Sequence, residues 1–178
     1  MLLPIAPSPV VSPSPYGVRA ASSLADVQAA YPLARHFFGD NTWSCALDDA
    51  LVARYPGGLL LLETAGQVVG YADLYDLTWD GVDALLTDGE HALTLDHFRA
   101  PGRGAAVYWA GIAVWPEHRP LGSPHLKAAV DSRLAGPQPH MGLAESPAGA
   151  RLFQQRGWHP LGGKAWGNAA FVAARRAL

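Results

Sequence analysis

The residues best suited to chemistry lie between Gly111 and Leu126, in the segment GIAVWPEHRPLGSPHL. An apolar run ends at Pro116, Arg119 follows, and a turn rich in Gly, Pro and Ser precedes an amphipathic stretch. This order predicts a strand, a turn and the N-terminus of a helix. Unpaired backbone N–H groups and the positive end of the helix dipole converge at such a turn, so the segment predicts a pocket for an anion.

The elements that would hold this pocket follow one another from residue 16 onward. We expect strands at 16–20, 59–64, 68–75, 105–114, 140–144, 158–161 and 165–174. We expect helices from Ser22 or Ser23, at 44–55, from the 122–124 turn to Gly136, and at 146–157. Pro32 should interrupt the first helix, and Ser123 should cap the third with Pro124 in its first turn. This order predicts an α/β domain built on a mixed sheet.

The chain divides into a tail, one domain and one insertion. Residues 1–15 contain five prolines and predict an extended, flexible tail, whereas 16–178 predict a single domain. Residues 77–104 are polar and predict an insertion or lid. Acidic residues outnumber basic ones there: Asp80, Asp83, Asp88, Glu90 and Asp96 against Arg99 and Arg103. An acidic lid would concentrate a cationic amine, and a solvated loop is the alternative.

Composition excludes several classes of function. A formal net charge of −2 over 178 residues gives no general attraction to nucleic acid or to an anionic membrane. Cys45 is the single cysteine and the histidines lack paired ligand spacing, so neither a disulfide nor a metal site is predicted. No apolar stretch reaches the roughly 20 residues of a membrane span, and the N-terminus lacks the basic region of a signal peptide. We therefore expect a cytoplasmic protein.

Two motifs resemble those of the GNAT superfamily, the acyl-CoA-dependent N-acetyltransferases. The pattern Val114-x-Pro116-x-x-Arg119-x-x-Gly122 resembles the cofactor-binding motif of that family. The stretch from Ser146 to Trp158, SPAGARLFQQRGW, resembles the motif in the helix after the family's fifth strand. With the matching order of elements, the resemblance covers about residues 16–174. It implies a GNAT-like central mixed sheet of about seven strands flanked by helices.

The resemblance also implies a cosubstrate and the residues that bind it. The cosubstrate would be acetyl-CoA, and the acceptor a primary amine on a small molecule or a peptide. Backbone groups of Ile112, Ala113 and Val114 would face the pantetheine arm and the acyl oxygen. The diphosphate would meet Arg119 and the backbone N–H groups of Leu121, Gly122, Ser123 and His125, while Pro120 and Pro124 each remove one donor. A Gly122→Trp replacement should then abolish CoA binding and leave the fold intact.

The sequence supplies few groups for proton transfer. The family often has a tyrosine as general acid at the position of Phe153, which carries no proton to donate. The 105–114 strand holds no Asp, Glu or His, and Tyr108 is its single titratable residue. Asp73, Asp76 and His97 are candidates for a base acting through water, with a solvated surface role as the alternative for each. The catalytic acid and base are therefore not assigned.

Three functions remain open at this point. The first is acetyl transfer to an amine without a covalent enzyme intermediate. The second is a binding module that keeps the cleft but lacks catalysis, which Phe153, Pro120 and Pro124 favour. The third is a structural role as a homodimer whose cleft is filled by Trp109, Trp115 or Trp158.

Overall fold

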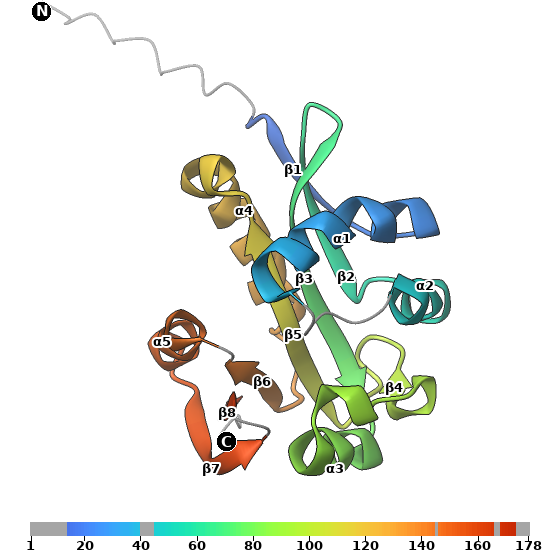
Figure 1. Cartoon of the computed structure of the whole chain (residues 1–178), viewed down its shortest axis with the longest axis vertical. Helices are drawn as coiled ribbons and strands as arrows, with labels where there is room; N and C mark the ends of the chain where they lie inside the picture. Colours follow the sequence, from blue (N-terminus) through green and yellow to red (C-terminus); the bar gives the residue numbers. More distant parts are fainter. Residues whose placement is uncertain (1–13, 40–44, 145, 166–167, 174–178) are drawn as a thin grey trace, which may run out of the picture.

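The computed structural model describes residues 14–39, 45–144, 146–165 and 168–173, so the predicted tail lies almost wholly outside the described residues. The strands are β1 (Tyr16–Ala20), β2 (Leu59–Thr64), β3 (Gln67–Leu77), β4 (Phe98–Arg99), β5 (Ala106–Val114), β6 (His140–Ala144), β7 (His159–Ala165) and β8 (Asn168–Ala173). The α-helices are α1 (Leu24–Phe38), α2 (Cys45–Arg54), α3 (Trp79–Asp88), α4 (Arg119–Arg133) and α5 (Pro147–Gln155). Short 3₁₀ helices are η2 (Glu90–Ala92), η3 (Leu95–His97) and η4 (Pro116–His118). The predicted mixed α/β architecture is confirmed (Figure 1).

One sheet runs through the described molecule in the order β1-β2-β3-β5-β6-β8-β7, and β4 pairs with the end of β3. Neighbouring strands are antiparallel except β5 and β6, which run parallel. The β2–β3 hairpin turns through Ala65 and Gly66, whose φ angles are 49° and 76°. Positive φ at both turn residues matches the right-handed twist of the strands, as the predicted hairpin requires.

The helices cover both faces of the sheet. Leu126 and Val130 of α4 and Phe153 of α5 pack on one face, where they form a core cluster with inward residues of β2, β3 and β5. Helices α1, α2 and α3 bury their apolar sides against the other face, in two further clusters. The side chains alternate along each strand, so β5 presents Tyr108 to one face and Trp109 to the other. The sheet is thus enclosed between two layers of helices.

Two helices differ from the sequence prediction at their prolines. Helix α1 begins at the predicted cap, Ser23, but continues through Pro32 to Phe38. Helix α4 begins at Arg119, so Pro120 lies in its first turn, Pro124 lies inside it and Ser123 is not its cap. In both cases apolar residues on one side of the helix are buried across the proline. Burial on the sheet outweighs the one backbone hydrogen bond that each interior proline removes.

The 77–104 segment contains more regular structure than expected. Helix α3 begins at the cap residue Thr78, whose hydroxyl accepts from the Gly81 N–H at 2.9 Å. Leu85 and Phe98 are fully buried, so the segment contributes to the core at the end of the sheet where Figure 1 shows α3 and β4. Its action as a lid stays a prediction. None of the helices in the described ranges is long and apolar enough to cross a membrane.

Candidate functional site at the β5–β6 divergence

The central strands β5 and β6 pair over a short length and then separate. Their register joins Val107, Tyr108 and Trp109 to residues 140–142, and no pairing between them is recorded beyond Trp109 in the described chain. A bulge lies at the same point, because Asp73 of β3 faces Gly111 while Leu74 faces Trp109. Ala110 is therefore an extra residue, and it bends β5 away from β6. The divergence opens the sheet in its middle.

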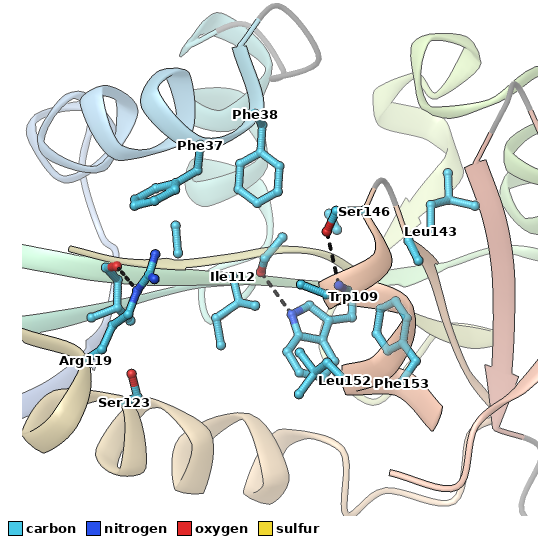
Figure 2. A pocket seen from close by; sticks show the side chains of 17 residues that line it. Phe37, Phe38, Trp109, Ile112, Arg119, Ser123, Leu143, Ser146, Leu152 and Phe153 are labelled. Atoms are coloured by element: carbon cyan, nitrogen blue, oxygen red, sulfur yellow. Dashed lines mark hydrogen bonds between the residues drawn. The ribbon is translucent and has the colours of Figure 1, made fainter. Parts of the chain in front are cut away.

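A cavity of about 470 Å³ fills the opening, and we call it the β5–β6 cavity. Residues 109–114 of β5 form its floor, and residues of α1, α4, β6 and α5 form its walls. Figure 2 shows Phe37 and Phe38 entering from α1, with Trp109, Leu152 and Phe153 on the opposite side of the strands. Trp109 donates its indole N–H to the Gly111 carbonyl at 3.0 Å. The walls are thus mainly apolar, and Trp109 lines the cavity rather than closing it.

The backbone of β5 presents polar groups to the cavity. Trp115 donates its N–H to the Val69 carbonyl at 3.0 Å, and Ala113 faces Tyr71 in the same β3–β5 ladder. Because direction alternates along an antiparallel strand, the N–H groups of Ile112 and Val114 point away from β3, toward the opening. The Val114 carbonyl accordingly accepts from Arg119 Nε at 3.0 Å. Of the three β5 residues predicted to bind the cofactor, Ile112 and Val114 direct their backbone groups toward the cavity.

The first turn of α4 offers fewer N–H donors than the sequence analysis predicts. The first four N–H positions of a helix lack helical acceptors, and here they belong to His118, Arg119, Pro120 and Leu121. His118 donates to the Trp115 carbonyl at 2.9 Å, Arg119 donates to the Pro116 carbonyl, and proline has no N–H. The N–H groups farther along, at 122, 123 and 125, point at carbonyls four residues earlier within the helix. Leu121 carries the remaining N–H of this turn, and the carbonyls three and four residues before it belong to His118 and Glu117 of η4.

Of the α4 residues predicted to bind the cofactor, two line the cavity and the others do not. Arg119 and Ser123 line the cavity, and the Arg119 guanidinium lies 5.3 Å above the Phe37 ring. Leu121 is 66% exposed, and His125 Nε2 lies 2.8 Å from Ser14 Oγ, beside β1. A Cβ on Gly122 would lie 2.8 Å from Leu62 Cδ2. The expectation that Gly122→Trp preserves the fold is therefore wrong, because the replacement would enter the core rather than the cavity.

Comparisons with known proteins support the architecture. No family model matches the chain, and no curated protein matches it in sequence. Among solved structures, the loading GNATL domain of CurA from Lyngbya majuscula is 13% identical, with a TM-score of 0.66 over 89% of this chain and 97% of that one. The GNAT-like decarboxylase GphF in complex with isobutyryl-CoA is 18% identical, with a TM-score of 0.58 over 89% and 98%.

A third structure is the diaminobutyrate acetyltransferase EctA from Paenibacillus lautus, in complex with L-2,4-diaminobutyric acid and coenzyme A. It is 16% identical, with a TM-score of 0.56 over 88% of this chain and 93% of that one. This chain has the GNAT fold. The predicted order of elements around two motifs is confirmed by these matches.

Within this GNAT fold, Asp76 and His97, two of the candidates for proton transfer, make hydrogen bonds away from the cavity. Asp76 is 1% exposed, and its carboxylate accepts from Arg133, from Gln138 and from the N–H groups of Gly102 and Gly104. It holds the β3–β5 connection in place, so the expected surface role is wrong. His97 Nδ1 accepts from the Thr94 N–H at 3.1 Å in the η3 turn. Neither residue lines the cavity.

Asp73 faces Gly111 at the bulge, and its side chain is half-buried. Burial raises its pKa well above the usual value, and the charges of Asp48 and Glu90 raise it further. Burial also raises the pKa of Asp48 to about 7. Glu90 accepts a hydrogen bond from the hydroxyl of Tyr108, which is fully buried. Three carboxylates thus gather beside one another on the face covered by α1, α2 and α3.

This group of three carboxylates is not predicted from the sequence, although two local signals point to it. Asp48 precedes Leu51 and Val52 by three and four residues, so it shares their buried side of α2. Asp73 alternates with Tyr71 and Tyr75 on β3, and both tyrosines are buried. No comparable signal identifies Glu90. Across the described residues, no group of three His, Cys, Asp or Glu side chains is arranged to hold a metal ion.

Proposed function

We propose that this chain is an N-acyltransferase, which binds an acyl-CoA thioester, acetyl-CoA, in the β5–β6 cavity and transfers the acyl group to a primary amine. The observation that carries the proposal is the divergence of β5 from β6, with the N–H groups of Ile112 and Val114 directed into the opening. The GphF and EctA structures support it, since the same fold holds a CoA derivative in each. The acceptor class is a small-molecule or peptide amine.

The proposed chemistry needs little from side chains. A thioester carbonyl that accepts from a β5 N–H is polarised, and the oxyanion that forms on attack is stabilised by the same donor. Apolar walls around Trp109 and Leu152 exclude water and so strengthen that hydrogen bond. The amine attacks the carbonyl carbon directly, the C–S bond breaks, and the thiol of CoA leaves. No covalent enzyme intermediate is required.

The CoA diphosphate would lie at the N-terminal turn of α4. Arg119 supplies positive charge at the rim of the cavity, and the Leu121 N–H would be the backbone donor of the first turn. With one amide instead of the predicted four, we expect modest affinity for CoA.

A second candidate function is a binding module that keeps the fold without turnover. The observation that favours it is the same α4 turn, where Pro120 and the 3₁₀ hydrogen bonds of His118 and Arg119 reduce the set of donors. Phe153, at the position where the resemblance implies a general acid, also favours the binding module. Homodimerisation and a cytoplasmic location remain predictions for either function.

Calorimetric titration with CoA and acetyl-CoA, followed by a thiol-release assay over a panel of primary amines, tests the proposal. Ser123→Trp places a large side chain in the cavity and should lower CoA affinity at least about tenfold. Ala128→Trp, at an exposed position of the same helix, should leave affinity unchanged. Binding and amine-dependent thiol release support the transferase, and binding without release supports the binding module. Absence of binding at millimolar CoA overturns both.

A further inference from the structure

Gly111 leaves room for a small group between the cavity and the acidic residues. A Cβ built on Gly111 would lie 3.4 Å from Asp73 Oδ2 and 3.5 Å from Tyr71 Oη. Gly111 itself lines the β5–β6 cavity, one residue before Ile112. The lining of the cavity includes Gly111 but not Asp73, so a ligand atom placed where that side chain is missing would extend from the cavity toward a carboxylate oxygen.

The bulge in β5 fixes this arrangement. Asp73 pairs with Gly111, and residues paired across antiparallel strands direct their side chains to the same face of the sheet. On that face the Asp73 carboxylate lies over Gly111, at the point where β5 leaves β6. An acyl carbonyl that accepts from the Ile112 N–H would meet the residue directly after Gly111 on the same strand. The carboxylate and the proposed reacting carbonyl are thus adjacent to the same stretch of β5.

The surroundings of Asp73 are acidic and phenolic. The titratable groups that face it are Asp48 of α2, Glu90 of η2, Tyr71 and Tyr75 of β3, and Tyr108 of β5. No ion pair between Asp73 and a basic side chain is formed among the described residues. An ammonium bound beside Gly111 would therefore meet the Asp73 carboxylate without displacing a basic side chain from any of these ion pairs.

We infer that Asp73 is the catalytic base of the proposed transfer, and that it accepts a proton from a protonated amine held in the space beside Gly111. The inference rests on the proposed function. The ammonium gives one proton to Asp73 and becomes a neutral amine. Its lone pair attacks the thioester carbon, and the C–S bond breaks. The second proton goes from the amide nitrogen to the departing thiolate, so that the free thiol leaves, and Asp73 returns its proton to water.

The acidic surroundings suit this role. Desolvation and the neighbouring carboxylates raise the pKa of Asp73, which brings it nearer to that of an amine. Proton transfer between groups of similar pKa has a small free-energy cost, and a base whose pKa lies near the working pH is the most effective. The same charges attract the amine in its cationic form.

The test is Asp73→Asn, compared with the unchanged chain in the thiol-release assay at saturating acetyl-CoA. The expected result is a kcat lower by about a hundredfold or more for an alkylamine, with CoA affinity unchanged by calorimetry. The acidic limb of the pH profile should disappear. With an amine that is already neutral at the assay pH, the loss should shrink to a few fold, which a merely structural role would not produce.

A second variant keeps the inference testable if Asp73→Asn fails to fold. Gly111→Ala inserts a methyl group 3.4 Å from Asp73 Oδ2, in the space assigned to the amine. We expect kcat/KM for the amine to fall about tenfold while CoA affinity holds. Gly17→Ala, on β1 with no atom within 4 Å of its Cβ, is the matched control and should match the unchanged chain.

The outcomes separate this inference from the proposed function. If the unchanged chain releases thiol with amines and Asp73→Asn keeps its rate and pH profile, the inference is overturned and the transferase stands. An equal loss for protonated and neutral amines also overturns it. If the unchanged chain releases no thiol with any amine, the proposed function is overturned, and the inference is overturned with it.

Discussion

Phe153 stacks on Trp158 with ring centroids 4.7 Å apart and 8° between the rings, and it meets Trp109 edge-on at 5.6 Å. At the scale of single residues, this packing buries a ring without a hydroxyl at the position where the resemblance implies a tyrosine. The tip of the ring, Cζ, lies over Gly142 of β6, where a Cβ would come within 2.5 Å of it. Phe153 therefore fixes the wall of the cavity between β6 and α5.

Gly142→Ala tests this packing. The new methyl group overlaps Phe153 Cζ, and since the aromatic stack has little room to shift, we expect a loss of about 1–3 kcal/mol in the free energy of unfolding. Urea denaturation of the variant and the unchanged chain measures the loss. Gly17→Ala is again the matched control, and it should change stability by less than about 0.5 kcal/mol. Equal stability of Gly142→Ala and the unchanged chain would show that the stack adapts.

The sequence predicts some of the site at this scale and misses the rest for a physical reason. Ile112 and Val114 could be predicted because the apolar run that forms β5 is visible in the sequence. The sequence leaves a surface role open for Asp73, since a single strand does not show which helices will cover it. Its position beside Gly111 also needs the bulge at Ala110, a property of the paired strands and not of either sequence alone.

At the scale of elements, the prolines of α1 and α4 show how packing decides helix boundaries. Gly122, Leu126 and Val130 are spaced by four residues and are all buried, and this spacing already extends across Pro124 in the sequence. The capping preference of Ser123 is a local effect of about 1 kcal/mol. Burial of these three residues on the sheet contributes more free energy than the cap would, so the helix begins at Arg119. Element order could be predicted from the sequence because each element has its own pattern, whereas these boundaries depend on contacts across the molecule.

Pro120→Ala and Pro124→Ala should have different effects, because the two prolines lie at different depths in α4. Pro120→Ala adds an N–H in the first turn beside the proposed diphosphate site, so CoA affinity should rise about tenfold with little change in stability. Pro124→Ala adds an N–H that bonds inside the helix, so stability should rise by about 1–2 kcal/mol with CoA affinity unchanged. Calorimetric titration and urea denaturation measure the two effects. If both variants bind CoA alike, the diphosphate does not lie at this turn.

At the scale of the whole molecule, the sheet consists of two parts that meet at β5 and β6. One part is the antiparallel ladder of β1, β2, β3 and β5, and the other comprises β6, β8 and β7. The described register joins them through residues 107–109 and 140–142, and α4 and the Trp109–Phe153–Trp158 stack add further contacts. The cavity lies where pairing stops, so the same short junction that limits contact between the parts creates the candidate site.

The buried carboxylates near that junction should make the stability of the whole molecule depend on pH. The pKa of Asp48 rises from 3.8 to about 7 on folding, so between these values the folded state binds more protons than the unfolded state. The free energy of unfolding should therefore fall as the pH rises from about 4 to about 7. Asp48→Asn removes this charge. We expect it to flatten the pH dependence and to stabilise the protein at pH 7 by about 1–2 kcal/mol, a value reduced by solvent near the partly exposed side chain.

Urea denaturation across this pH range measures the effect, with the exposed Asp83→Asn as the control for an equal change of net charge. A loss of stability in Asp48→Asn at pH 7 would contradict the prediction, because it would mean that Asp48 has a compensating partner in the folded protein.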